Sequence, residues 1–532
     1  MPRGGARPGN CICRGGGYNF GGGNGTKDAP WLITSRDDLI ALAEFLNSGD
    51  AASYNNCDGC YFLQTADIDL KDVTWEPIGY SGSTCFAGNY DGGGHIIANA
   101  HSKGKADTDE EGNYSSTAGI FGWVASGSVQ NLHVKAATFE ATGKNDYSFV
   151  GGITGVCYGA SIENCSVTNS TLESKRNNNN NCAGSIAGYS AGGKFENCAA
   201  ENNQVKSMAY GGGFVGEVDD DNDGITTPSA FINCYAAKCK VTATTGDPRG
   251  SSFAGGFAGQ ITNEKPTAEN CFVYRVNLST DGTSASHPSI GVFAGNLWKN
   301  LPTFQSKIDT TNCYYGECGT TKNAEGAEQK TAEEFENGTV AGLLGDAFAQ
   351  ARNYPKFKDS PADYSAVDAA IANANALNSD EYNNFSAVED AINAVVRGKP
   401  LSEQAAVDAM AKAIEDAIAA LQYKGADYSA VDAAIAKADA LNRDEYKNFS
   451  AVDAAVRAVV RGKPLTEQDA VDAMAKAIED AIAALEKKPV EMTVQLPQTG
   501  DDSNLALWMA LLLVSGAAIG AMMAGKKKNY GK

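Results

Sequence analysis

A two-part motif that returns six times along the chain is the strongest constraint on its fold. The first part combines small and apolar residues, as in Gly119-Ile120-Phe121-Gly122. The second part ends in an asparagine, and the intervals between these asparagines are 33, 33, 36, 37 and 42 residues for Asn131, Asn164, Asn197, Asn233, Asn270 and Asn312. Short apolar segments at a near-regular spacing, with a turn residue at one phase, predict a β-solenoid with about three short parallel strands per coil.

The asparagines and glycines of the motif suit a stacked coil. Asparagine tolerates the left-handed backbone of a corner, and its amide can bond to the asparagine of the next coil. Glycine beside a bulky apolar residue allows neighbouring backbones to approach closely. The repeats resemble the GLUG repeats of bacterial surface proteins, and this resemblance implies a right-handed parallel β-helix with end caps over residues 26–360.

The segments that flank the repeats are expected to close the solenoid. The lead-in contains a helix, expected over 35–46, that would cover the open end and its edge strands. Three carboxylates of the lead-in, Asp67, Asp69 and Asp91, are expected to fix turns and caps. The exit segment, 331–357, is expected to form a short helix that covers the opposite end.

Five of the cysteines share one phase of the repeat, namely Cys165, Cys198, Cys234, Cys271 and Cys313. We expect them to stack as buried thiols, because a cysteine thiol behaves as a small hydrophobe and parallel ladder side chains have poor disulfide geometry. Cys57 and Cys60, with Cys85, are a zinc candidate without an evident fourth ligand. A local disulfide is favoured over zinc, either Cys57–Cys60 or Cys313–Cys318.

Two near-copies follow the repeats, over 363–421 and 427–485. Each copy contains three apolar stripes at helical spacing, which predicts a three-helix bundle. The second stripe of the first copy includes Val396, and Ser402 and Thr466 are expected to cap the third helices. The copies resemble FIVAR modules, some of which are associated with binding of sugars or host matrix.

A spacer role is favoured for these bundles over a binding role. Their tyrosines could stack on a sugar, but a tyrosine at the edge of a bundle more often packs against the core. The four in question are Tyr364, Tyr382, Tyr428 and Tyr446.

The C-terminal region carries three features in a fixed order. A pentapeptide comes first and consists of Leu496, Pro497, Gln498, Thr499 and Gly500. An apolar run over 505–525 follows, long enough to cross a bilayer as a transmembrane helix, and the lysines at 526–528 would stay cytoplasmic. This order resembles the sorting signal of LPXTG proteins, the substrates of sortases. A permanent tail anchor with a chance pentapeptide is the alternative.

The resemblance implies covalent anchoring to the cell wall of a Gram-positive bacterium. A sortase cysteine would attack the carbonyl of Thr499 and release the chain from Gly500 onward. An amine of a peptidoglycan precursor would then take over the acyl group. Insertion of 505–525 into the membrane would therefore be transient.

The N-terminal region does not supply the export signal that such a protein needs. Residues 1–25 are rich in glycine and contain no apolar stretch, so we expect the natural start to lie upstream of Met1. The net charge of −21 disfavours nucleic acid as a partner, because phosphate binding needs a basic face. The sequence has no His-Glu-x-x-His run, which argues against a metalloprotease of that type.

One loop has part of a calcium-binding pattern. Asp219, Asp221 and Asp223 alternate ahead of a glycine and could supply hard oxygen ligands, but Ala230 stands where the bidentate acid of a complete loop is expected. A solvated acidic loop is the alternative. No pair of acidic residues recurs at coil spacing, so no catalytic residues are assigned.

These observations predict a multidomain protein. Its parts are a leader (1–25), a β-helix (26–360), two three-helix bundles (361–424 and 425–488) and a sorting signal with a transmembrane helix (489–532). The favoured function is a sortase-anchored, non-enzymatic adhesin or ligand-binding solenoid on a helical stalk, whose host or glycan ligand is not identified. The alternatives are a wall-anchored lyase or glycosidase, and a structural display module without its N-terminal partner domain.

Overall fold

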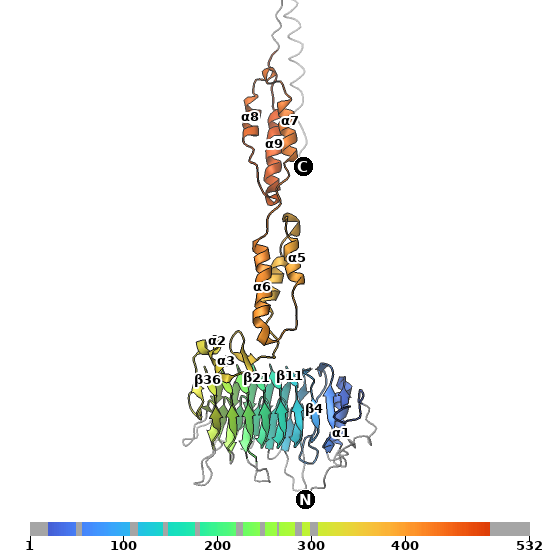
Figure 1. Ribbon diagram of the computed structural model, residues 1–532, viewed down its shortest axis with the longest axis vertical. Helices are drawn as coiled ribbons and strands as arrows, with labels where there is room; N and C mark the ends of the chain where they lie inside the picture. The colour runs from blue at the N-terminus through green and yellow to red at the C-terminus, as the bar shows by residue number, and fades with distance from the viewer. Residues whose placement is uncertain are drawn as a thin grey trace, which may run out of the picture. The chain divides into compact units, whose positions relative to one another are not determined.

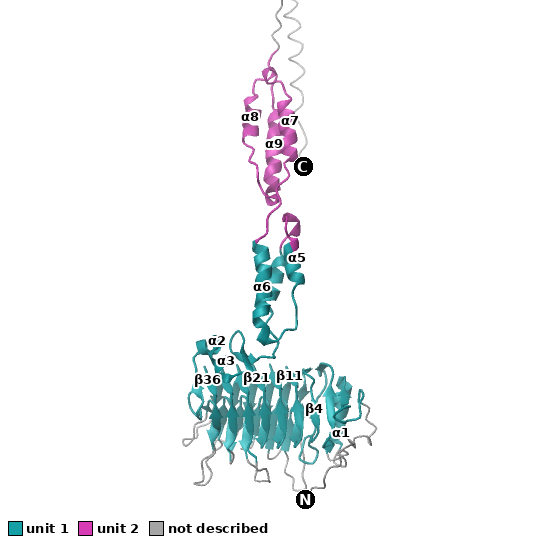
Figure 2. Ribbon diagram, viewed as in Figure 1, with its two compact units in different colours: residues 1–376, 387–419 teal, residues 377–386, 420–532 magenta. Residues whose placement is uncertain are grey.

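The computed structural model describes residues 20–48, 56–106, 115–141, 147–175, 181–219, 227–244, 251–262, 265–281, 290–297 and 307–489. The chain forms two compact units, one of residues 1–376 and 387–419 and the other of residues 377–386 and 420–532 (Figure 2).

The first unit contains a parallel β-solenoid whose strands stack into five sheets (Figure 1). Sheet 1 consists of β1 (Trp31–Ile33), β2 (Tyr61–Gln64), β4 (Asn89–Asp91), β10 (Ser128–Gln130), β15 (Ser161–Glu163), β20 (Lys194–Glu196), β25 (Ala230–Ile232), β30 (Thr267–Glu269) and β35 (Asp309–Thr311). Sheet 2 consists of β3 (Ile68–Asp69), β5 (Ile96–Ala98), β11 (His133–Lys135), β16 (Ser166–Thr168), β21 (Ala199–Glu201), β26 (Tyr235–Ala237), β31 (Phe272–Tyr274), β36 (Tyr314–Gly316) and β37 (Glu328–Gln329).

The other three sheets complete each coil. Sheet 3 consists of β6 (His101–Ser102), β12 (Thr138–Ala141), β17 (Thr171–Ser174), β22 (Gln204–Ser207), β27 (Lys240–Ala243) and β32 (Asn277–Thr280). Sheet 4 consists of β7 (Lys105–Ala106), β8 (Ser115–Ala118), β13 (Tyr147–Gly151), β18 (Asn181–Gly184), β23 (Tyr210–Gly212), β28 (Phe253–Gly255) and β33 (Ile290–Gly291). Sheet 5 consists of β9 (Phe121–Ala125), β14 (Thr154–Tyr158), β19 (Ala187–Ala191), β24 (Val215–Asp219), β29 (Ala258–Thr262) and β34 (Ala294–Leu297).

The parallel β-solenoid predicted from the repeats is confirmed, but a coil has more strands than expected. One coil runs through β10, β11, β12, β13 and β14, so the prediction of three strands per coil was wrong. The glycine motif itself accounts for two of the five strands, because β13 ends at Gly151 and β14 begins at Thr154. A side chain at Gly151 would meet the backbone oxygen of Thr154 at 2.0 Å, so this reversal requires glycine.

The asparagine corners behave as predicted. All six asparagines of the motif have φ between 50° and 53°, in the left-handed region. From Asn164 onward, each amide donates to the asparagine of the preceding coil, at 3.1 Å for Asn164 to Asn131 and 2.9 Å for Asn197 to Asn164. The ladder continues through Asn233, Asn270 and Asn312, and at its start Asn131 donates to Asp91.

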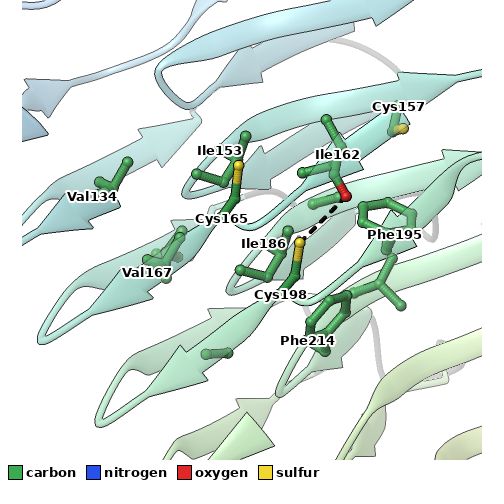
Figure 3. Packing of buried hydrophobic residues seen from close by; sticks show 14 of the residues in the cluster. Val134, Ile153, Cys157, Ile162, Cys165, Val167, Ile186, Phe195, Cys198 and Phe214 are labelled. Atoms are coloured by element: carbon green, nitrogen blue, oxygen red, sulfur yellow. Dashed lines mark hydrogen bonds between the residues drawn. The ribbon is translucent and has the colours of Figure 1, made fainter. Parts of the chain in front are cut away.

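The solenoid core is packed with aliphatic, aromatic and cysteine side chains (Figure 3). The five in-phase cysteines are buried thiols, as predicted. Each thiol donates to backbone carbonyls, as the Cys198 thiol does to the carbonyl of Ile162 at 3.3 Å. Figure 3 marks this bond with a dashed line. The cysteines therefore fill the core while satisfying their weak donors on the backbone.

The lead-in helix has the expected place and nearly the expected bounds. Helix α1 (Arg36–Asn47) follows Ser35, whose hydroxyl caps it by accepting from the backbone of Asp38 at 3.3 Å. It buries Leu39, Leu42 and Phe45 against the first coils. The helix thus continues the apolar core past the first strands.

The exit segment packs differently from the prediction. Helices α2 (Ala332–Glu336) and α3 (Thr339–Leu344) and the hairpin of β38 (Phe348–Gln350) and β39 (Pro355–Phe357) lie on the outer face of sheet 2 instead of its end. The reason is an aromatic column on that face, formed by Tyr235, Phe272 and Tyr314. At this end the coils of the solenoid are instead continued by Lys322 and Asn323. Their backbone carbonyls accept hydrogen bonds from the backbone N–H groups of Val292 and Phe293.

Each helical copy contains three α-helices and short 3-10 turns. The first has α4 (Ser365–Asn375), α5 (Ser386–Asn393) and α6 (Gln404–Ala419), with η3 (Ser379–Glu381) and η4 (Leu401–Glu403). The second has α7 (Ser429–Asp439), α8 (Ser450–Arg457) and α9 (Gln468–Ala483), with η5 (Arg443–Glu445) and η6 (Leu465–Glu467). In the second copy Val431, Val452 and Ile478 share one buried cluster.

Two details of the helical prediction were wrong. Ser402 lies inside η4 and Thr466 lies inside η6, so neither residue caps an α-helix. In both copies a 3-10 turn comes directly after the extended backbone of Pro400 or Pro464. Val396 is 57% exposed, because α5 ends at Asn393 and the chain then leaves the helical path. Within the part of the chain that the structure describes, no helix is long and apolar enough to span a membrane.

Candidate functional site

The predicted sortase site lies outside the described residues. Leu496, Pro497, Gln498, Thr499 and Gly500, and the apolar run over 505–525, all belong to that region. They remain predictions from the sequence.

The candidate calcium loop is only partly described. Asp219 is the last residue of β24, and Asp221 and Asp223 lie outside the described residues. Within the described ranges, no group of three or more His, Cys, Asp or Glu side chains could hold a metal ion. The calcium site therefore also remains a prediction from the sequence.

Both predicted local disulfides were wrong. Cys313 and Cys318 are buried thiols, each 6% exposed or less. Cys60 is in a disulfide, but Cys57 is not its partner. Burial raises the pKa of the Cys165 and Cys234 thiols well above the ordinary value, so these two thiols stay protonated.

Two of the three lead-in carboxylates, Asp67 and Asp69, have the structural roles predicted for them. Asp67 accepts from the backbone of Ile96 at 3.0 Å, and this bond lowers its pKa. Asp69 accepts from the amide of Asn99 at 2.9 Å, which lowers its pKa in the same way. Both carboxylates are tied to the next coil and are not arranged around an open site.

The bundle tyrosines hold backbone in place. The hydroxyl of Tyr428 donates to the carbonyl of Val460 at 2.8 Å and accepts from the backbone of Lys463 at 3.1 Å, while the Arg461 guanidinium covers its ring at 5.0 Å. Tyr364 makes the same three contacts in the first copy. The rings and hydroxyls of Tyr364 and Tyr428 therefore already have partners within their own bundles.

A carboxylate that the sequence did not suggest is buried on the outside of sheet 5. Glu217 is 9% exposed, and it accepts from the Cys182 thiol at 3.1 Å and from the Gln260 amide at 3.1 Å. Burial, with the nearby Glu217 charge, raises the pKa of the Cys182 thiol well above its usual range. These bonds join sheets 4 and 5, so we assign Glu217 a structural role.

One candidate for ligand binding is a groove of 520 Å³ on the outer face of sheet 1, over β2, β4 and β10. Strand β4 lies near the end of the solenoid that carries α1 (Figure 1). We call this candidate the sheet-1 groove. Its lining residues are Lys27, Pro30, Tyr61, Phe62, Leu63, Asn89, Tyr90, Asp91, Ser128 and Gln130.

Strand register explains how the groove forms. Phe62, Tyr90 and Val129 point into the core, so their neighbours on each strand point outward. The outward side chains form two rows that run across the three strands. One row consists of Tyr61, Asn89 and Ser128, and the other consists of Leu63, Asp91 and Gln130. The floor of the groove is thus a grid of six side chains.

The turn before β1 forms a wall beside this floor. The side chain of Asn24 accepts from the backbone and the hydroxyl of Thr26, at 3.1 and 2.8 Å. Gly25 accepts from the backbone of Tyr61 at 2.9 Å, which joins the turn to β2. Lys27 and Pro30 of this turn reach the groove.

Sequence reasoning missed the groove because most of its residues precede the repeats, and Gln130 stands inside the second part of the motif, where only Asn131 was considered. A recognisable signal was present in Tyr61-Phe62-Leu63, Asn89-Tyr90-Asp91 and Ser128-Val129-Gln130, each of which has a buried apolar residue between two outward ones. A second hollow of 380 Å³ lies between sheets 2 and 3 and includes Asn202, Gln204, Lys238 and Lys240 in its lining.

Comparisons with known proteins do not assign this chain to a family. No family model and no curated protein matches it. A "putative immunoglobulin A1 protease from Bacteroides ovatus" matches with a TM-score of 0.45 and 22% identity, over 64% of this chain and 96% of that one. A structure named "IgA1 Protease" matches with a TM-score of 0.29 and 13% identity, over 56% of this chain and 21% of that one. At these values neither likeness carries an argument about function.

Proposed function

We propose that this chain is a surface protein that a sortase attaches to peptidoglycan through Thr499. In this proposal the solenoid is a ligand-binding domain and the two helical copies form a stalk beside the wall. The observation that carries the anchoring is the order of the C-terminal features, which are the pentapeptide 496–500, the apolar run 505–525 and the lysines 526–528.

The nature of the two folded regions supports this division of roles. A solenoid presents long rows of side chains on fixed sheets, which suits recognition of an extended ligand. The tyrosines at equivalent positions of the two copies, Tyr364 and Tyr428, make their hydrogen bonds within the bundles and so leave less for a ligand to use. The two copies therefore fit the role of spacers.

Anchoring is tested by the covalent end of the mature protein. The chain is expressed behind a secretion signal in a Gram-positive host that has a sortase, and wall material is released with a muralytic enzyme. Mass spectrometry should find the C-terminal peptide ending at Thr499 and carrying a peptidoglycan fragment. The matched variant Thr499→Ala should lose this product and collect in the membrane and medium.

A mature chain that still contains Trp508 and the terminal lysines would contradict the proposal. The same product in a host strain without sortase would also contradict it. The first result would favour a permanent membrane anchor, and the second would favour a transpeptidase other than a sortase. Neither result would affect the fold of the solenoid.

A further inference from the structure

We propose that the sheet-1 groove binds an uncharged pyranose unit of a glycan. This inference rests on the ligand-binding half of the proposed function and is independent of wall anchoring. The groove has a volume of 520 Å³, which falls in the range of small-molecule sites.

The groove has an apolar end and a polar end, as a sugar ring requires. Tyr61 and Leu63 of β2 lie beside Pro30 at the wall. The next two strands add only polar side chains, which are Asn89 and Asp91 on β4 and Ser128 and Gln130 on β10. A pyranose has one face of C–H groups that can stack on an aromatic ring and an edge of hydroxyls that needs hydrogen-bonding partners.

The polar end is already held in position before a ligand arrives. Gln130 donates its amide to Asp91 at 2.7 Å, which leaves the Gln130 carbonyl oxygen as an oriented acceptor. Ser128 donates to Asn89 at 2.9 Å, and Asn89 in turn donates to the carbonyl of Cys60 at 3.3 Å. The groups therefore lose little freedom on binding, which favours affinity.

The charges of the groove favour a neutral sugar. Its lining has one carboxylate, Asp91 on the floor, and one ammonium, Lys27 of the wall. Asp91 also accepts from the backbone of Gly93 and the amide of Asn131, so its charge is shared among donors within the protein. An anionic glycan would meet this carboxylate in a chain whose net charge is −21.

Titration of the full chain with neutral trisaccharides tests the proposal. Cellotriose, maltotriose, mannotriose and triacetylchitotriose are used as probes in calorimetry and in saturation-transfer NMR. At least one should bind, with its ring C–H protons receiving the strongest saturation. Tyr61→Ala should weaken that binding by about tenfold or more, because the stacking surface is lost.

Matched variants separate a binding effect from misfolding. Gln130→Met keeps the size of the side chain and removes its amide, so it should weaken binding while the unfolding midpoint stays within a few degrees. Lys240→Ala, in the second hollow, and Tyr147→Ala, a tyrosine 43% exposed on sheet 4, should leave binding unchanged.

Three results would overturn the proposal. One is no binding of any probe by the full chain at millimolar concentration. Another is binding that Tyr61→Ala and Gln130→Met leave unchanged. The third is selection of extended peptides, and no glycan, at this groove. None of the three would affect the mass of the wall-linked peptide, so failure here is distinguishable from failure of the anchoring.

Discussion

At the scale of single residues, the asparagine ladder is the clearest link between sequence and stability. Asn197 has φ of 53°, donates to Asn164 and accepts from Asn233, both at 2.9 Å. Asn197→Ala removes both side-chain bonds and places a Cβ-bearing residue without local compensation in the left-handed region. We expect a loss of about 2–3 kcal/mol in the free energy of unfolding, measured by denaturant titration.

Glycine at the same position separates the two causes. Asn197→Gly keeps access to the left-handed backbone and loses only the amide bonds, so its loss should be near 1 kcal/mol. If the alanine and glycine variants were equally stable, the backbone conformation would not be the reason for asparagine at this corner.

A second prediction at this scale concerns pH. His133 lies in β11, its Nδ1 is 2.8 Å from the hydroxyl of Ser166, and burial lowers its pKa. Below about pH 6.5 the unfolded chain binds the proton more readily than the folded chain, so stability should fall as the pH falls from 7.5 to 5.5. The measurement is denaturant unfolding at both pH values. His133→Gln should show a smaller decline, and an equal decline would exclude this imidazole as the cause.

At the scale of elements, a single tyrosine closes each helical bundle. The Tyr428 hydroxyl joins the start of α7 to the extended stretch before η6 through Val460 and Lys463. Tyr428→Phe removes both bonds and should lower the free energy of unfolding of the second bundle by about 1–2 kcal/mol. The measurement is circular dichroism during thermal unfolding. Tyr446→Phe is the matched control, because the described structure shows no hydrogen bond from that hydroxyl. Equal effects of the two variants would refute the proposed role.

The sequence predicted those features that depend on local chemistry repeated at a fixed interval. The solenoid, the asparagine corners and the cysteine ladder follow from one residue type returning at one phase, as at Asn164 and Cys165. The placement of the exit helices was not predictable in this way, because it depends on an aromatic column formed by residues as far apart as Tyr235 and Tyr314. The same limit hid the groove, since only the register of β2, β4 and β10 brings Tyr61 near Ser128.

At the scale of the whole molecule, the chain combines two kinds of fold with different sources of stability. In the solenoid, each coil is hydrogen-bonded to its neighbours through parallel strands and shared side-chain ladders. A substitution that destabilises one coil therefore also destabilises the coils beside it. In the second unit, α7, α8 and α9 have their own buried cluster around Val431 and Ile478. Separate cores of this kind can unfold separately.

We therefore expect calorimetry of the full chain to show at least two unfolding transitions. Asn197→Ala should lower the transition of the solenoid, and Tyr428→Phe should lower that of the second bundle, each by several degrees and without moving the other. The assignment can be followed independently by the loss of helical and of strand signals in circular dichroism. A single transition that both variants shift together would mean that the two folds unfold as one cooperative unit, and the helical copies would then not be the independent spacers that the proposed function requires.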